Sequence, residues 1–269
     1  MPPLPPAAPC RPAPRTRWKS LKERGSVRIA IGNEPPYTEL KSDGTVSGAA
    51  PDVARAVFKK LGIDELEPVV SEYGAMIPGL QAGRFDAVTA GLFMKPQRCN
   101  AVAYSEPVLC DAEAFLVKKG NPKNLTSFKS IAESSDATIG APGGGTEERL
   151  SLEAGVPRNR VIVVPDPQSG LTMLQQGRID VYSLPVLSIN SLAENAGDEV
   201  EVVAPVEDSP IACDGAAFPK DATALRDAFD VQLAELKASG EFAEIIEPYG
   251  FSAKAAMATS REKLCSAEQ

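Results

Sequence analysis

The sequence predicts an α/β protein of two lobes with a ligand site between them. From Ser26 onward, patterns typical of strands and helices alternate, an order that favours parallel sheets joined by helices. The length of 269 residues suits two modest domains. The phrase LQAGRFDAV at 80–88 returns at 174–182 as LQQGRIDVY, so each lobe is expected to carry one copy. In open α/β sheets, ligands bind outside the carboxyl ends of the strands.

The first lobe opens with a strand and a loop that cannot be helical. Residues 27–31 (VRIAI) are apolar at nearly every position, and Pro35 and Pro36 follow in a loop that ends at Tyr37. A hairpin turn is predicted at Asp43-Gly44. The elements expected next are a helix at 52–61, a strand at 68–71, a helix at 75–81 and a strand at 85–90.

The second lobe repeats this order before the chain returns to the first. Its expected elements are a strand at 137–140, a glycine loop at 143–145, a helix at 146–154, a strand at 161–164, a helix at 171–176 and a strand at 179–183. Two further helices are expected at 222–236 and near 242–246, the longer one with an apolar face made of Leu225, Phe229, Leu233 and Leu236.

This pattern suggests where the lobes begin and end. Crossing strands near 116–118 and 202–206 are the hinge candidates. The expected division is a disordered, proline-rich extension at 1–25, lobe one at 26–115 plus 206–269, and lobe two at 116–205.

The composition excludes several functional classes. A net charge of −8 and a pI near 4.9 argue against a surface that binds nucleic acid or anionic lipid. The absence of histidine removes Ser-His and Cys-His nucleophile pairs and most zinc sites. No apolar run approaches the roughly 20 residues of a membrane span. We therefore expect binding without chemistry, or carboxylate or lysine chemistry, and no cofactor.

Neither the N-terminus nor the cysteines identify the compartment. Residues 1–25 lack the apolar core of a secretory signal and are interpreted as an extension or a misassigned start. Two cysteines fall in expected tails and three in the body: Cys10 and Cys265, then Cys99, Cys110 and Cys213. Two interpretations stay open, a Cys99–Cys110 disulfide, which would indicate an oxidising compartment, or buried free thiols.

Several motifs occur in an order that carries a family resemblance. They are the strand and loop at 27–37, the segments 48–54 and 73–80, Gly83 with Asp86, Arg98, the segment 104–107, and the segment 140–146 with the repeat ending at Asp180. On these residues, over 26–251, the chain resembles the periplasmic solute-binding proteins of polar-amino-acid-type ABC importers. The resemblance implies the type II two-lobed fold with two hinge strands, a solute in the inter-lobe cleft, a membrane permease as partner, a periplasmic location and a monomer.

The resemblance implies that Arg98 binds the carboxylate of the ligand and that Gly145 and Thr146 donate further hydrogen bonds to the same carboxylate. A planar guanidinium offers paired donors to a carboxylate and stays charged. Free amides and a hydroxyl at a helix start also suit an anion. The plain alternatives are a solvated arginine, and a flexible glycine turn before a helix that Thr146 caps.

Departures from the family pattern concern the cation. Where relatives that bind α-amino acids carry an ammonium-binding aspartate, this chain has Pro185, and where they carry a small hydroxyl residue it has Phe93. With Tyr37 and Tyr73, Phe93 would give three aromatic walls, which suit a delocalised cation through about 0.5–2 kcal/mol per ring. Glu34 would accept from an N–H of that cation. The alternatives are core packing for the rings and an exposed loop position for Glu34.

A carboxylate beside a ring amidinium describes ectoine and hydroxyectoine, and the pattern is similar to that of the ectoine- and hydroxyectoine-binding proteins of this family. Betaines or a polar amino acid are the alternative ligands. The alternative of a different class is a periplasmic cyclic-acid dehydratase on the same fold, which would need a general acid or base, with Glu34 as the candidate. A detached sensor module is a third interpretation.

Overall fold

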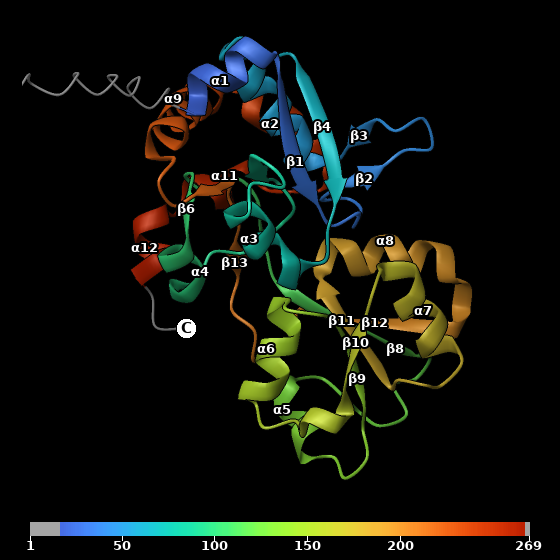
Figure 1. Ribbon diagram of the computed structural model, residues 1–269. Helices are drawn as coiled ribbons and strands as arrows, with labels where there is room; N and C mark the ends of the chain where they lie inside the picture. Colours follow the sequence, from blue (N-terminus) through green and yellow to red (C-terminus); the bar gives the residue numbers. More distant parts are fainter. Residues whose placement is uncertain (1–16, 267–269) are drawn as a thin grey trace, which may run out of the picture.

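The computed structural model describes residues 17–266, and its two large sheets have five strands each (Figure 1). In the order in which they pair, the strands of the first sheet are β4 (Glu65–Val70), β1 (Ser26–Ile31), β5 (Ala87–Val88), β14 (Ala217–Pro219) and β6 (Val102–Tyr104). Those of the second are β10 (Val161–Val164), β9 (Ile139–Pro142), β11 (Val181–Pro185), β8 (Glu113–Lys118) and β12 (Val200–Val203). Each sheet combines parallel and antiparallel pairs.

Helices lie against both sheets. Those of the first lobe are α1 (Arg17–Arg24), α2 (Ala49–Lys60), α3 (Tyr73–Gln81), α4 (Pro96–Ala101), α9 (Thr223–Ser239), α10 (Glu241–Ile246), α11 (Ala253–Met257) and α12 (Arg261–Ser266). Those of the second are α5 (Phe128–Glu133), α6 (Thr146–Glu153), α7 (Pro167–Gln175) and α8 (Val186–Ala196). Short 3₁₀ turns occupy Arg158–Arg160, Gly197–Glu199 and Glu247–Tyr249. The hairpin predicted at Asp43-Gly44 joins β2 (Glu39–Leu40) to β3 (Val46–Ser47).

The repeated phrase builds the same local structure in both lobes. Gly83 and Gly177 end their helices with φ of 69° and 71°, a left-handed conformation that glycine adopts without steric cost. The aspartate that follows each glycine accepts a backbone N–H near the start of the neighbouring strand. Asp86 accepts from the amide of Arg28 at 3.0 Å, and Asp180 from that of Thr138 at 2.8 Å. The repeat therefore fixes one helix end to one strand start in each lobe.

The chain crosses between the lobes through a small antiparallel sheet of two strands, β7 (Cys110–Asp111) and β13 (Ala212–Cys213). The crossing segments expected at 116–118 and 202–206 lie farther into the second lobe: 116–118 belong to β8, and Val202 pairs with Leu116 across β8 and β12. The predicted crossing points were wrong because both segments are short apolar runs. Such a run is typical of a buried strand as well as of a strand that crosses between lobes.

The cysteines pair in a way that sequence spacing did not reveal. Disulfides join Cys99 to Cys265 and Cys110 to Cys213. The proposed Cys99–Cys110 pair and the free thiols are therefore both wrong for these residues. Cys110 and Cys213 face each other across β7 and β13, and Cys265 lies in α12 rather than in a loose tail. Pairing followed tertiary register, to which closeness along the chain is a poor guide.

The segment 17–25 corrects the expectation of a disordered extension. Residues Arg17–Arg24 form α1, whose Leu21 is only 2% exposed in the core of the first lobe, with Trp18 packed against it. This short helix was not predicted because the proline-rich composition at the beginning of the chain favours an irregular extension. The rest of that expectation, on 1–16, lies outside the described residues.

Candidate ligand site between the lobes

One cavity between the lobes is lined by all seven residues that the sequence singled out. They are Glu34, Tyr37, Tyr73, Phe93 and Arg98 from the first lobe, and Gly145 and Thr146 from the second. The carboxyl end of β1, the start of α3, the segment after β5, helix α4 and the start of α6 deliver these side chains. Gly91, Glu147 and Pro185 complete the lining. The cavity thus has the inter-lobe position expected for an α/β ligand site.

Arg98 is a buried cation with neutral partners. Only 7% of it is exposed. The two hydrogen bonds that it donates within residues 17–266 go to the carbonyl oxygens of Phe93 and Gly144, both at 2.9 Å. Desolvation by burial lowers the pKa of Arg98, yet a guanidinium stays protonated at neutral pH. A buried guanidinium that faces a cavity favours an anionic group as its counter-charge.

Glu34 is the opposite charge on the first lobe. It is 3% exposed, and the Ser188 hydroxyl of the second lobe donates to its Oε1 at 2.6 Å. The Tyr73 hydroxyl lies 3.2 Å from Oε2 and 2.8 Å from the Ala90 carbonyl oxygen. Desolvation, assisted by the charge of Glu147, raises the pKa of Glu34 to about 7. A cation in the cavity would favour the ionised form.

Glu147 is the site residue that the sequence analysis missed. It is the second residue of α6, directly after Thr146, and is 5% exposed. Desolvation raises the pKa of Glu147, while the charge of Arg98 and a hydrogen bond with Glu113 oppose that rise. The signal was a glutamate following GGGT at a helix start. It was passed over because acidic residues are common in the first turn of any helix.

Aromatic rings form the apolar part of the lining. The rings of Tyr37 and Phe93 meet edge to face, with centroids 6.3 Å apart, and Tyr37 packs in the same way on Phe251 at 4.7 Å. The Tyr37 hydroxyl donates to Asp111 Oδ2 at 3.1 Å, which fixes the ring. Pro185, at the start of α8, presents an apolar surface where amino-acid-binding relatives were expected to carry a carboxylate.

The glycine loop of the second lobe brings the two lobes into contact beside this cavity. The Gly74 amide donates to the Gly143 carbonyl oxygen at 3.0 Å. Gly144 has φ of 72°, and a Cβ added to it would lie 2.5 Å from Gly74 Cα. The sequence assigned these glycines to anion binding, whereas the structure shows that Gly144 also permits a close approach of backbones.

Two features of the described residues would indicate a different function, a metal site and a membrane-spanning helix. Within residues 17–266, no group of three or more acidic or cysteine side chains is arranged to hold a metal ion. No helix in that range is long and apolar enough to cross a bilayer.

Comparisons with known proteins identify the family. The model of the bacterial extracellular solute-binding proteins, family 3, matches residues 27–252. The probable amino-acid ABC transporter periplasmic-binding protein y4tE of Sinorhizobium fredii is 36% identical over 243 residues, 87% of this chain and 79% of that protein. The crystal structure of EhuB in complex with hydroxyectoine is 71% identical, covers 94% of this chain and 99% of that one, and superposes with a TM-score of 0.93.

A more distant neighbour bears on the fold alone. An ancestral amino-acid-binding protein described as a precursor of cyclohexadienyl dehydratase is 24% identical, covers 86% of this chain and 98% of its own, and has a TM-score of 0.75. These findings confirm the type II two-lobed binding-protein fold. The chain belongs to the bacterial extracellular solute-binding proteins, family 3.

Proposed function

We propose that this protein binds ectoine and hydroxyectoine as the solute-binding component of an ABC importer. The observation that carries the proposal is the charge pattern of the cavity: one buried guanidinium, two buried carboxylates from opposite lobes, and aromatic walls. The relative that is 71% identical was crystallised with hydroxyectoine, which supports the same ligand class.

Each part of the ligand has a partner of matching chemistry. The ligand carboxylate is bound by Arg98, with Thr146 and the Gly145 amide as further donors. The amidinium has two N–H groups, and Glu34 and Glu147 accept one each. The flat cationic ring lies against Tyr37, Tyr73 and Phe93, where cation–π attraction adds to apolar contact.

The same pattern disfavours the competing ligands. A betaine has no N–H, so it would offer Glu34 and Glu147 a buried positive charge but no hydrogen-bond donor. A free α-amino acid has a compact, strongly hydrated ammonium, and Pro185 offers it no charge in exchange for its water.

Closure of the lobes is the proposed signal to the importer. Ligand contacts to both lobes stabilise the closed form, which a membrane permease then recognises. We place the hinge at β7 and β13, so lobe two is the stretch between them, 112–211, instead of the 116–205 expected from the sequence, and lobe one lies on either side. Asp111 of β7 accepts from Tyr37 in lobe one and from the amide of Leu187 in lobe two, both at 3.1 Å. It therefore links the hinge to the site. The family and this role imply a periplasmic monomer.

We infer binding without catalysis. Glu34 and Glu147 are accounted for by the cation, and the described cavity lining holds no third carboxyl group that could act as a general acid for dehydration. Incubation with prephenate or arogenate should give no product, and turnover of either would contradict this inference.

A calorimetric competition series tests the ligand. Ectoine and hydroxyectoine are expected to bind with Kd in the micromolar range or better, about −8 kcal/mol. Glycine betaine should bind more weakly, and glutamine, histidine and arginine more weakly still. Tight binding of an ordinary amino acid that ectoine fails to displace would overturn the proposal.

A further inference from the structure

Helix α4 carries both the clamp residue Arg98 and the disulfide residue Cys99. It spans only the six residues Pro96–Ala101, and its N-cap residue, Lys95, makes no side-chain capping hydrogen bond. So short a helix gains little stability from its own hydrogen bonds, because the cost of forming its first turn is barely recovered. What packs against α4 must therefore determine where Arg98 lies.

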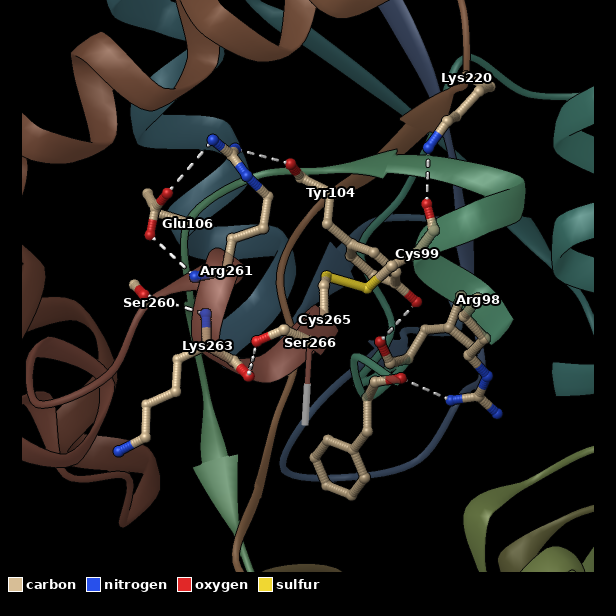
Figure 2. Close-up of a disulfide and its surroundings, with 12 residues drawn as sticks. Arg98, Cys99, Tyr104, Glu106, Lys220, Ser260, Arg261, Lys263, Cys265 and Ser266 are labelled. Carbon is tan, nitrogen blue, oxygen red and sulfur yellow. Dashed lines mark hydrogen bonds and ion pairs between the residues drawn. A yellow bond between two sulfur atoms is a disulfide. The ribbon is translucent and has the colours of Figure 1, made fainter. Parts of the chain in front are cut away.

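Helix α12 is held firmly to the first lobe by Arg261. The Arg261 amide donates to Glu106 Oε2 at 3.1 Å, and its guanidinium contacts Glu106 at 3.3 Å and Asp230 at 2.6 Å. The same guanidinium donates to the Tyr104 carbonyl oxygen at 2.9 Å (Figure 2). Leu264 of α12 is buried in the core. This helix is thus a fixed support at the end of the described chain.

The Cys99–Cys265 disulfide connects this support to α4. Figure 2 shows the disulfide beside Arg98, with the Lys220 ammonium donating to the Cys99 carbonyl oxygen at 2.7 Å. Arg98 itself has one hydrogen bond within its lobe, to Phe93, and one to Gly144 of the other lobe. The second exists only while the lobes touch. In an open form, the placement of Arg98 depends on Phe93 and on the frame around α4.

We infer that Cys99, Cys265 and α12 form a strap that positions Arg98 for the ligand carboxylate before the lobes close. This rests on the proposed function, in which Arg98 binds that carboxylate. Cys99 and Cys265 are positioning residues here, since neither lines the cavity. A clamp held in its binding geometry loses less conformational freedom when ligand arrives, and the affinity rises accordingly.

The test compares two ligands on a Cys99→Ser/Cys265→Ser double variant. One ligand is ectoine, and the other is its methyl tetrahydropyrimidine ring without the carboxylate. Titration calorimetry should show the Kd for ectoine rising about fivefold to tenfold, the effect of one side chain that must now be ordered on binding. The Kd for the carboxylate-free ring should stay within twofold of wild type, because that ring does not use Arg98.

Two further variants separate positioning from general destabilisation. Cys110→Ser/Cys213→Ser removes the other disulfide, which joins β7 to β13 and not α4 to α12, and should change both Kd values by the same factor. Arg261→Met keeps the Cys99–Cys265 disulfide but removes the ion pairs that hold α12, so it should weaken the binding of ectoine and not that of the carboxylate-free ring. This variant also provides the test if the double serine variant does not fold.

The outcomes distinguish the two proposals. Failure of the wild-type protein to bind ectoine would reject the proposed function. If wild type binds ectoine normally and the folded strap variants bind it with a Kd within twofold of wild type, the strap proposal is rejected. The proposed function then still stands. An equal loss for both ligands would also reject it, since that shows loss of stability rather than of positioning.

Discussion

Three ionisable side chains line the cavity and are buried, Arg98, Glu34 and Glu147, and in the proposed function they give it its selectivity. Buried charges destabilise a protein unless a partner compensates them, so this set is costly without a ligand. A zwitterion supplies all the missing partners in one molecule. Ligand binding and the stability of the closed form are therefore coupled at the level of single residues.

Arg98→Ala should weaken ectoine binding by about 2–5 kcal/mol, the usual loss when one partner of a buried charge pair is removed. Titration calorimetry on the variant measures this directly. Arg178→Ala is the matched control, because that arginine is exposed in the second lobe, and it should bind like wild type. An Arg98→Ala protein that binds ectoine within twofold of wild type would show that the carboxylate lies elsewhere.

Glu34→Gln should weaken ectoine binding yet stabilise the ligand-free protein at alkaline pH. The pKa of Glu34 is about 7 in the folded protein against 4.5 as its ordinary value. The folded state therefore holds more protons between these values, and the free energy of unfolding falls as pH rises from 4.5 to 7. Glutamine does not ionise, so the variant should gain about 3 kcal/mol at pH 8, and little at pH 4.5.

Thermal melts of the ligand-free wild type and the variant at both pH values check this. A difference in melting temperature that is the same at pH 4.5 and pH 8 would mean that Glu34 does not titrate in this window. Betaine binding should fall less than ectoine binding in the same variant, because betaine offers Glu34 no N–H.

At the scale of elements, most helices and strands could be predicted because each is bounded by a residue of special geometry. Gly83 and Gly177 end helices, and Asp43-Gly44 makes the hairpin. The seven residues predicted for the site from the family resemblance and its departures line one cavity, and their roles in binding stay a prediction. The sequence did not predict the position of Glu147 in the site, the strands β7 and β13, or the cysteine pairs. These features depend on how distant segments pack together, which local sequence patterns do not show.

Gly144→Ala tests whether the glycine loop acts through close backbone approach. The added methyl would meet Gly74 and should prevent full closure, so ectoine affinity should fall by at least about tenfold, a loss of about 1.4 kcal/mol or more. Gly155→Ala is the matched control. Gly155 follows the same helix with φ of 94°, but a Cβ there has nothing within 4 Å.

Both variants carry similar left-handed strain, so both should be slightly less stable to heat. Only Gly144→Ala should lose binding, as measured by calorimetry. Equal ectoine affinities in the two variants would contradict a role for close approach at this position.

At the scale of the whole molecule, the second sheet is built from one continuous stretch, 113–203, whereas the first is built from both sides of it. Strand β14 pairs with β5 on one side and β6 on the other, so it lies inside the first sheet. Strands β5 and β6 do not pair with each other directly, so the sheet connects them only after β14 (Ala217–Pro219) has been placed between them.

We predict that this arrangement determines the order in which the two sheets fold. Contacts between residues far apart in sequence form late, because long loops must close first. Pulse-labelled hydrogen exchange during refolding should protect amides of β8, β9 and β11 before those of β5 and β6, and simultaneous protection of all five would contradict this order. Domains of a growing chain fold as they are completed. A polypeptide that emerges N-terminus first therefore carries a finished second lobe while its binding site does not yet exist.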